Sequence, residues 1–227
     1  MGNICIIPAR GGSKRIPRKN IKEFLGKPII AYSIKAAIDS GLFDEVMVST
    51  DDLEIADIAK KYGAKVPFMR SAKNSDDFAT TFDVIKEVIN YYKDQSIEFD
   101  NLCCLYSCAP FVTSELLLKA YDQLIEKKFD TVFPIIAYSF PIQRALRVDH
   151  QRKVSMILEE NLNARSQDLE ESFHDAGQFY WCNVKQVLNC KKILTINTGG
   201  IKISELDAQD IDTDKDWDLA ELKYQLK

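Results

Sequence analysis

The chain has 227 residues, 46% of them hydrophobic and 28% charged, a composition typical of a folded protein with one sizeable core. Its formal net charge is −4, so the surface as a whole attracts neither nucleic acid nor an anionic membrane, and any basic site must be local. The sequence shows no signal peptide and no apolar run long enough to span a membrane, and we expect a cytoplasmic protein.

Four short apolar runs have the length and composition of buried strands, and they span residues 3–8, 45–49, 101–106 and 131–137. Apolar residues recur at helical spacing within residues 30–38, 55–59, 85–92 and 116–124. Thr80 and Asp83 predict a capping box for the third helix, and Thr113 or Ser114 is the expected cap of the fourth. This alternation predicts an α/β fold with a Rossmann-like, mostly parallel sheet, helices on both faces, and ligands beyond the carboxyl ends of the strands.

The pattern changes in the second half of the chain. From residue 139 to about 182 the helical period is lost, and Gln, Asn, Arg and Glu become frequent. No internal repeat or flexible linker sets this stretch apart. We interpret the chain as one domain, residues 1–227, with an inserted arm at about 139–182.

The cysteines do not form a metal-binding pattern. They stand at positions 5, 103, 104, 108, 182 and 190 without a CxxC pair, and the chain has only 2 histidines. A zinc site needs closely spaced ligands of these two types. We therefore expect buried free thiols.

The loop after the first predicted strand is strongly basic, since five of the ten residues from 10 to 19 are Arg or Lys. Gly11 and Gly12 allow backbone N–H groups to approach an anion, and Arg10 and Lys14 supply charge-assisted hydrogen bonds to phosphate oxygens. The loop matches neither the P-loop nor the GxGxxG pattern. It predicts a site for several phosphates, with a solvated basic loop or a nucleic-acid patch as the alternatives.

A second polar loop, near the end of the chain, carries two carboxylates at a spacing of two residues. In an extended chain Asp210 and Asp212 point to the same side and can bind one hard cation such as Mg²⁺. Thr213, with Asp216 three residues later, is also the N-terminal signature of a final helix. Both interpretations can hold at once, with the two carboxylates on a metal and Thr213 at the helix cap.

Four motifs follow one another in a characteristic order: residues 7–14 (IPARGGSK), Lys19-Asn20, residues 49–52 (STDD) and residues 210–213 (DIDT). Together they resemble the acylneuraminate cytidylyltransferases, also called CMP-sialic acid synthetases, over nearly the whole chain. Lys19-Asn20 is similar to the sialate-type branch of this family, and residues 139–146 and 173–181 look like the members that act on pseudaminic acid. Residues 106–110 and 176–180 depart from the pattern of the members that use N-acetylneuraminate.

The resemblance implies a fold of the nucleotide-diphospho-sugar transferase type. It implies an enzyme that uses Mg²⁺ and CTP to place CMP on the C2 hydroxyl of an acidic nine-carbon sugar, with release of pyrophosphate. Pseudaminic acid is the expected sugar, in a pathway of flagellin glycosylation, and N-acetylneuraminate and legionaminate are the alternatives. The resemblance also implies a homodimer in which the inserted arm reaches the active site of the partner.

The same resemblance assigns roles to individual residues. Arg10, Ser13 and Asn20 would hold the triphosphate and ribose, and Arg70 with Thr81 would read the cytosine. The full nucleotide-binding set implied is Ala9, Arg10, Gly11, Gly12, Ser13, Lys14, Asn20, Arg70 and Thr81. The residues implied to face the sugar are Arg144, Arg165, Gln178 and Tyr180, although Arg70 as a surface charge and Tyr180 as core packing are alternatives.

The expected chemistry is in-line attack by the sugar hydroxyl on the α-phosphorus of CTP. Arg10 and Lys19 would stabilise the developing charge, while Asp210 and Asp212 would hold the metal, so these four are the predicted catalytic residues. Arg144 or Arg165 would bind the sugar carboxylate. Neither histidine has a context that marks it as a general base.

Three other functions match parts of the pattern. A catalytically silent CTP-binding protein would bind nucleotide without releasing pyrophosphate, and the carboxylate pair disfavours it. An RNA-binding module would use residues 10–19 and show steep salt dependence, which the acidic composition disfavours. A sugar-1-phosphate nucleotidyltransferase usually has a different glycine-rich opening.

Overall fold

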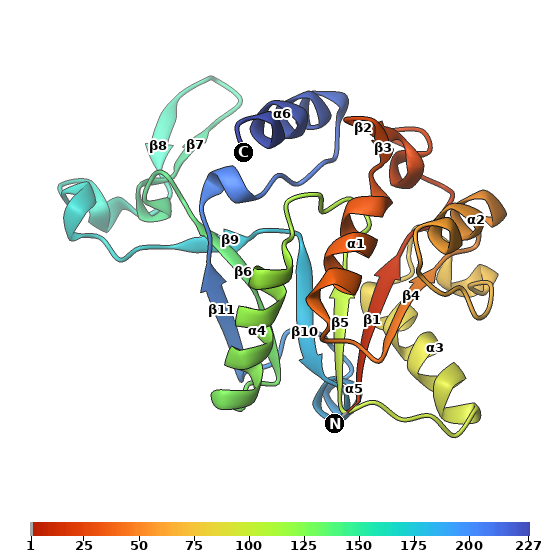
Figure 1. Cartoon of the computed structure of the whole chain (residues 1–227). Coiled ribbons are helices and arrows are strands. Elements are labelled where there is room, and N and C mark those ends of the chain that lie inside the picture. Colours follow the sequence, from red (N-terminus) through yellow and green to blue (C-terminus); the bar gives the residue numbers. More distant parts are fainter. Residues whose placement is uncertain (1) are drawn as a thin grey trace.

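A seven-stranded sheet runs through the centre of the computed structural model, which describes residues 2–227 (Figure 1). The strand order is β11-β6-β10-β5-β1-β4, with β9 paired to β6 beside this path. The strands of this sheet are β1 (Asn3–Pro8), β4 (Glu45–Ser49), β5 (Asn101–Leu105), β6 (Thr131–Ala137), β9 (Phe173–Asp175), β10 (Phe179–Asn183) and β11 (Thr198–Lys202). The four strands expected from apolar runs are all present.

The directions of the strands make the sheet mixed but mostly parallel. β1 is parallel to both β4 and β5, and β11 is parallel to β6. β10 lies between β5 and β6 and is antiparallel to both, and β9 is antiparallel to β6. The carboxyl ends of β1, β4, β5, β6 and β11 therefore meet at one edge, which is where ligands bind in folds of this kind.

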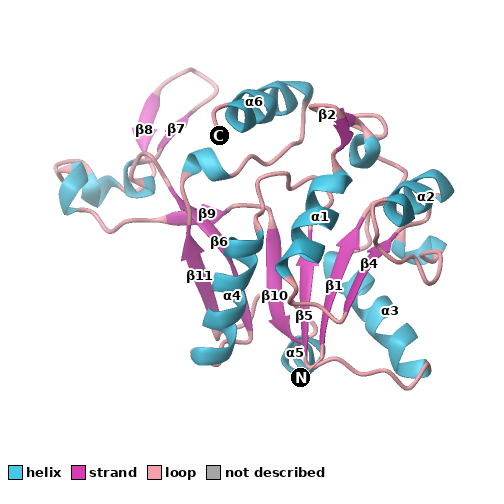
Figure 2. Cartoon of the chain, in the orientation of Figure 1, coloured by secondary structure: helices cyan, strands magenta, loops and turns pink. Residues whose placement is uncertain are grey.

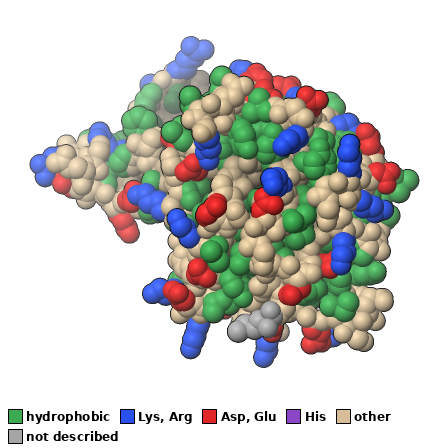
Figure 3. Space-filling model, in the orientation of Figure 1, with side chains coloured by type: hydrophobic (Ala, Val, Ile, Leu, Met, Phe, Trp, Pro, Cys, Tyr) green, Lys and Arg blue, Asp and Glu red, His purple; other side chains and the backbone are tan. Residues whose placement is uncertain are grey.

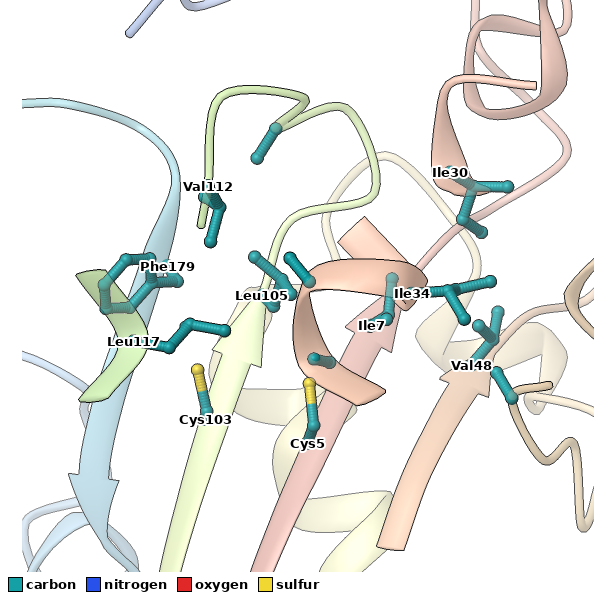
Figure 4. Packing of buried hydrophobic residues seen from close by; sticks show 14 of the residues in the cluster. Cys5, Ile7, Ile30, Ile34, Val48, Cys103, Leu105, Val112, Leu117 and Phe179 are labelled. Carbon is teal, nitrogen blue, oxygen red and sulfur yellow. The ribbon is translucent and has the colours of Figure 1, made fainter. Parts of the chain in front are cut away.

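Helices cover both faces of the sheet, as predicted (Figure 2). One face is covered by α1 (Ile30–Ser40), α2 (Leu53–Lys61) and α4 (Ser114–Glu126), and the other by α3 (Thr81–Asp94) and α5 (Val184–Cys190). Alternate side chains of β1 pack on the two faces of the sheet, because successive side chains of a strand point in opposite directions. Ile7 lies beside Ile34 in the cluster of the first face (Figure 4), and Ile6 belongs to the cluster of the second.

A third apolar cluster holds the end of the chain over the carboxyl edge of the sheet. It joins α6 (Asp214–Gln225) to the hairpin of β2 (Glu23–Phe24) and β3 (Lys27–Pro28). Phe24 and Trp217 meet edge to face with ring centroids 5.6 Å apart, and Ile211 is buried in the same cluster. This packing brings residues 210–213 back to the loop that follows β1.

The expected arm differs in extent from residues 139–182. β9 and β10 fall within that range, yet both belong to the main sheet. The segment between β6 and β9 leaves the body and carries a separate hairpin of β7 (Leu146–Val148) and β8 (Val154–Met156) (Figure 1). β9 has only 3 residues, all exposed, and so carries too little apolar pattern to be recognised before its partner is known. β10 has 5 residues, as many as β4, and its buried run from Phe179 to Cys182 is an apolar signal that the arm interpretation passed over.

The predicted helix caps are present. Thr80 and Asp83 form a capping box, and Thr113 caps α4 by accepting from Leu116 N–H. All 6 cysteines are free; four are buried as expected, but Cys108 is only partly buried and Cys190 is exposed. Within residues 2–227 no helix is both long and apolar enough to cross a membrane.

Candidate active site

The basic loop lies directly beyond the carboxyl end of β1 and is braced by the loop after β4. Ala9 N–H donates to the Ser49 carbonyl at 2.9 Å, and Gly11 N–H donates to Asp51 Oδ1 at 2.9 Å. A Cβ on Gly11 would lie 2.8 Å from an Asp52 carboxylate oxygen, so this position requires glycine for close approach. The N–H of Gly11 is thus used inside the protein, whereas Gly12 faces open space.

The loop forms one wall of a cavity of about 480 Å³. Cationic side chains of Arg10, Lys14 and Lys19 line it, together with Ser13 and Asn20. The other lining residues are Pro8, Arg15, Arg70, Asn74, Asp76, Asp77, Ala79, Thr80, Thr81, Val84 and Tyr106. Six of the nine predicted nucleotide-binding residues therefore border one space, while Ala9 is buried behind it.

A second cavity, of about 220 Å³, contains the carboxylate pair. Asp210 and Asp212 line it with Ser107, Cys108 and Gly177. Pro8, Lys19, Asn20 and Tyr106 line both this cavity and the larger one. The two spaces adjoin, so a ligand in one can meet a ligand in the other.

The basic loop and the acidic loop are in direct contact. Lys19 Nζ donates to the Ile211 carbonyl at 2.6 Å and lies 3.8 Å from Asp212 Oδ1. Arg15 forms an ion pair with Asp212 at 2.7 Å. The two ends of the sequence that carry the phosphate-type and metal-type motifs therefore converge at one site.

The environment of Asp210 favours a bound cation. Partial burial, then the neighbouring charge of Asp212, raises the pKa of Asp210 above its usual value, while Lys19 acts in the opposite direction. Within residues 2–227 no group of three or more His, Cys, Asp or Glu side chains forms a complete metal site. A pair of carboxylates is nevertheless the protein contribution that Mg²⁺ commonly uses, with phosphate oxygens as further ligands. The residues present fit that ion.

The helix-cap interpretation of the acidic loop also holds. Thr213 caps α6 through Asp216 N–H, and the Asp216 carboxylate accepts from the backbone N–H groups of Asp212 and Thr213. Asp216 is therefore used for the cap, which leaves the carboxylates of Asp210 and Asp212 to face the cavity. The cap fixes the backbone on which this pair stands.

Arg70 is buried at the edge of the larger cavity, so the surface-charge interpretation of this residue is wrong. Its side chain is only 7% exposed, and its guanidinium donates to the hydroxyl of Ser49 at 2.9 Å and to the Ser49 carbonyl. Desolvation lowers the pKa of Arg70, and the Asp51 carboxylate opposes that shift. Thr81, the first residue of α3, lines the same cavity.

Asn20 is a brace between the loops. Its amide donates to the Arg10 carbonyl at 2.8 Å, and its carbonyl oxygen accepts from the Ser107 hydroxyl at 2.8 Å and from Cys108 Sγ at 3.3 Å. Asn20 is only 8% exposed, yet it borders both cavities. It holds the basic loop against the end of β5.

Two predicted sugar-facing residues lie on the arm, away from these cavities. Arg144 bonds to the Ser166 hydroxyl at 3.3 Å, and Arg165 pairs with Asp168 at 2.7 Å. Neither residue is among those that line the two cavities. Within one chain the structure does not bring Arg144 and Arg165 to the carboxylate pair.

The other two predicted sugar-facing residues lie on or just before β10 and are almost fully buried. Gln178 donates to the Asp207 carbonyl at 2.7 Å, and its own side-chain oxygen is buried without a hydrogen-bond partner in residues 2–227. Tyr180 packs against Tyr106 and donates its hydroxyl to Asp175. Burial raises the pKa of Tyr180 well above its usual range. Tyr180 is thus a core residue one layer behind the cavity wall formed by Tyr106.

Sequence reasoning missed several residues of the site. Asp77 contacts the basic loop, and Tyr106 and Cys108 border the carboxylate cavity. Position gave a usable signal for Tyr106, because it follows the last residue of a buried strand, at the edge where ligands bind. No local signal marks Asp77, since an acidic residue in a polar loop is usually solvated.

A cavity lined by cations adjoins a cavity with two carboxylates at the carboxyl edge of an α/β sheet, an arrangement suited to nucleotidyl transfer, which needs groups that bind phosphates and groups that bind a metal ion. A sequence model described as cytidylyltransferase matches residues 4–189, and the chain belongs to the cytidylyltransferase family, a family of nucleotidyltransferases.

Curated relatives match along the whole chain. A pseudaminic acid cytidylyltransferase of Campylobacter jejuni is 43% identical over 100% of this chain and 97% of its own. A CMP-N,N'-diacetyllegionaminic acid synthase of Legionella pneumophila is 34% identical over 98% of this chain and 96% of its own. Full-length similarity on both sides means that the match extends through the arm.

Solved structures share the fold. A CMP:2-keto-3-deoxy-manno-octonic acid synthetase in complex with CTP superposes with a TM-score of 0.69 at 18% identity, covering 100% of this chain and 98% of its own. A 4-diphosphocytidyl-2C-methyl-D-erythritol synthase from Anaerococcus prevotii gives a TM-score of 0.63 at 16% identity, covering 99% and 98%. At these identities the likeness establishes the fold of the chain.

Proposed function

We propose that the chain transfers CMP from CTP to the C2 hydroxyl of pseudaminic acid and releases pyrophosphate. The observation that carries this proposal is the pair of adjoining cavities, one lined by the basic loop and the other by Asp210 and Asp212. The 43% identity to a pseudaminic acid cytidylyltransferase over the whole chain supports the choice of sugar. A cytoplasmic location is part of the proposal, since the reaction consumes CTP.

The larger cavity is the proposed nucleotide site. Arg10 and Lys14 bind the β- and γ-phosphates as charge-assisted donors, and Ser13 adds a hydroxyl. Asn20 acts mainly by holding the loop, because both ends of its amide are bonded within the protein. Arg70 reads the base, and its fixed bonds to Ser49 leave it little freedom to reorient.

Asp210 and Asp212 are the proposed ligands of Mg²⁺. The ion would neutralise charge on the phosphate oxygens and hold the phosphates in position. Desolvation, then the charge of Asp212, raises the pKa of Asp210, and a cation bound between the two carboxylates would relieve their repulsion. Gly177 lines the same cavity, and its φ of +64° favours glycine at this turn beside Asp210.

Lys19 is the proposed stabiliser of the reacting phosphate. It lines both cavities, and its ammonium is anchored by the Ile211 carbonyl on the acidic loop. A fixed positive charge at the junction of donor and acceptor sites stabilises negative charge that grows on the α-phosphate during in-line attack. Positioning and charge supply the rate, and no covalent intermediate is required.

The arm is the proposed dimer interface. Large apolar side chains are exposed on it, including Phe140 at 81%, Val148 at 65% and Leu162 at 64%. Figure 3 shows hydrophobic side chains, in green, on the part of the molecule that projects from the body. Apolar surface of this kind on a projecting element marks an interaction site. A second copy of the chain is the proposed occupant, and its arm would bring Arg144 and Arg165 to the sugar carboxylate in the active site of the first copy.

The test is pyrophosphate release from CTP and Mg²⁺ with pseudaminate, legionaminate and N-acetylneuraminate offered separately. We expect turnover with pseudaminate to exceed the other two by at least about tenfold in kcat/KM, because a few pocket contacts of about 1–3 kcal/mol each decide such choices. Preference for legionaminate would reassign the sugar. Release with none of the three acids would refute the proposed reaction.

A further inference from the structure

The carboxylate of Asp77 pairs with two cations of the basic loop, Arg10 and Lys14. Arg10 Nη1 lies 2.9 Å from Asp77 Oδ1, and Lys14 Nζ binds the other oxygen, Asp77 Oδ2. Arg10 also donates to the Asp76 carbonyl at 2.9 Å. The loop before α3 therefore lies across the cavity wall that carries the cations, and all four residues line that cavity.

The fold does not need these contacts. The Asp76 side chain holds the turn by accepting from the backbone N–H groups of Phe78 and Ala79 at 2.9 and 2.8 Å. The next residues, Thr80 and Asp83, cap α3 without Asp77. Asp77 itself is 43% exposed at its side chain, and the neighbouring Phe78 is 89% exposed, so nothing buries this part of the loop.

The ion pair of Arg18 and Asp52, formed by the same basic loop outside the two cavities, is an example of a structural contact. Asp52 is only 23% exposed at its side chain, receives two hydrogen bonds from Arg18, and also accepts from Ile55 N–H at the start of α2. Asp77 has no corresponding backbone partner within residues 2–227. The two carboxylates thus differ in role. Asp52 fixes the basic loop to the start of α2, whereas Asp77 pairs with Arg10 and Lys14, which line the cavity.

We propose that Asp77 is an internal competitor that occupies Arg10 and Lys14 in the empty enzyme, yields them to the triphosphate of CTP, and takes them back to displace pyrophosphate. Asp77 is thereby an affinity-determining residue of the reaction. This inference rests on the proposed function, since it assumes that phosphates bind at these two cations.

The charges make such an exchange reversible. A carboxylate carries one negative charge, and a triphosphate or pyrophosphate carries several, so the phosphates win when they are abundant. Exposed ion pairs contribute little individually, so Asp77 weakens binding without preventing it. An aspartate is already ionised at neutral pH, and the hydrogen bond from Lys14, followed by that from Arg10, lowers the pKa of Asp77 further.

The experiment compares Asp77→Asn with the unchanged protein by titration calorimetry, with inorganic pyrophosphate and CMP as separate ligands. Asp77→Ala is the second variant, and thermal unfolding checks that both are folded. Asp39→Asn is the matched control, because Asp39 forms an exposed pair with Lys35 at 2.6 Å on α1. We expect pyrophosphate to bind both Asp77 variants about three- to tenfold more tightly, and CMP to bind within twofold of the unchanged protein.

CMP is informative because it lacks the β- and γ-phosphates that need Arg10 and Lys14. Equal or weaker pyrophosphate binding in the variants would overturn the proposal, since Asp77 would then hold the cations in place. An equal gain for CMP and pyrophosphate would also overturn it, because the effect would be a general change of charge. No sugar enters this titration, so its result stands apart from any failure of the proposed transfer reaction.

Discussion

Arg15 and Asp212 form an ion pair of 2.7 Å that joins the basic loop after β1 to the acidic loop before α6. The pair lies beside Lys19, whose Nζ is 3.8 Å from the same carboxylate oxygen. Two side-chain cations, Arg15 and Lys19, therefore lie next to the Asp212 carboxylate. If Mg²⁺ displaced one of them from Asp212, the carboxylate would still have a positive partner.

Asp212→Asn should abolish most activity while the fold persists. Loss of a charged group that acts on the transferring phosphate costs about 100- to 1,000-fold in kcat. Steady-state pyrophosphate release with CTP and pseudaminate measures this loss, and circular dichroism checks the fold. Asp214→Asn is the control, because Asp214 pairs with Lys22 at 3.3 Å and is 75% exposed at its side chain. Near-normal turnover in Asp212→Asn would remove this carboxylate from the mechanism.

Gly11→Ala should disturb the basic loop, whereas Gly12→Ala is the matched control in which the added methyl group meets no neighbour. A Cβ on Gly11 would lie 2.8 Å from Asp52 Oδ2 and 3.0 Å from Asp52 Cβ, whereas a Cβ on Gly12 meets nothing within 4 Å. We expect Gly11→Ala to lower stability by about 1–3 kcal/mol through overpacking. It should also weaken CTP binding by about tenfold or more, because the loop must shift. Denaturant unfolding and CTP titration measure the two effects, and equal behaviour of the two variants would contradict this account.

Asp210→Asn should stabilise the protein at neutral pH. The folded-state pKa of Asp210 is raised, so its contribution is fully present below the unfolded pKa and is lost as pH rises through the folded pKa. An uncharged Asn removes the penalty that remains at neutral pH. We expect Tm at pH 7 to rise by about 1–3 °C, with no gain near pH 3. Activity should fall in the same variant, and a lower Tm at pH 7 would contradict the assigned burial penalty.

Asp52→Asn should have the opposite pH dependence. The hydrogen bond from Arg18 holds the pKa of Asp52 at about 2, so its stabilisation is present above the unfolded pKa and is lost as pH falls through the folded one. The shift corresponds to about 2 kcal/mol at pH 6. The difference from the unchanged protein should shrink between about pH 4 and about pH 2. Asn keeps the helix-capping oxygen, so urea unfolding at several pH values isolates the charge. A pH-independent difference would assign the effect to packing.

Val148→Asp combined with Leu162→Asp should dissociate the proposed dimer. Both side chains are exposed in one chain, at 65% and 64%, and a charge in an apolar interface is costly. Light scattering after gel filtration should give about twice 25.9 kDa for the unchanged protein and one chain mass for the variant. Ile196→Asp is the control, since Ile196 is fully exposed outside the arm. A monomeric unchanged protein would refute the dimer.

Much of the body could be predicted from local pattern. β1, β4 and β6 are continuous apolar runs bounded by turns, and the apolar stripes of the helices repeat every three to four residues. Helix caps were equally accessible, because a capping box such as that of Thr213 and Asp216 is a contact between residues three apart. These features depend only on neighbours in sequence.

The chain by itself determined the alternation of strands and helices, the basic loop at residues 8–20 and the carboxylates of Asp210 and Asp212, because residue type and short spacing encode them. Only the tertiary structure decided that β10 enters the middle of the sheet, that Arg70 is buried on Ser49, and that Asp77 covers Arg10. Each of these is a contact between segments far apart in the chain. No local propensity specifies such contacts, since they exist only once the apolar faces of the sheet and helices have packed.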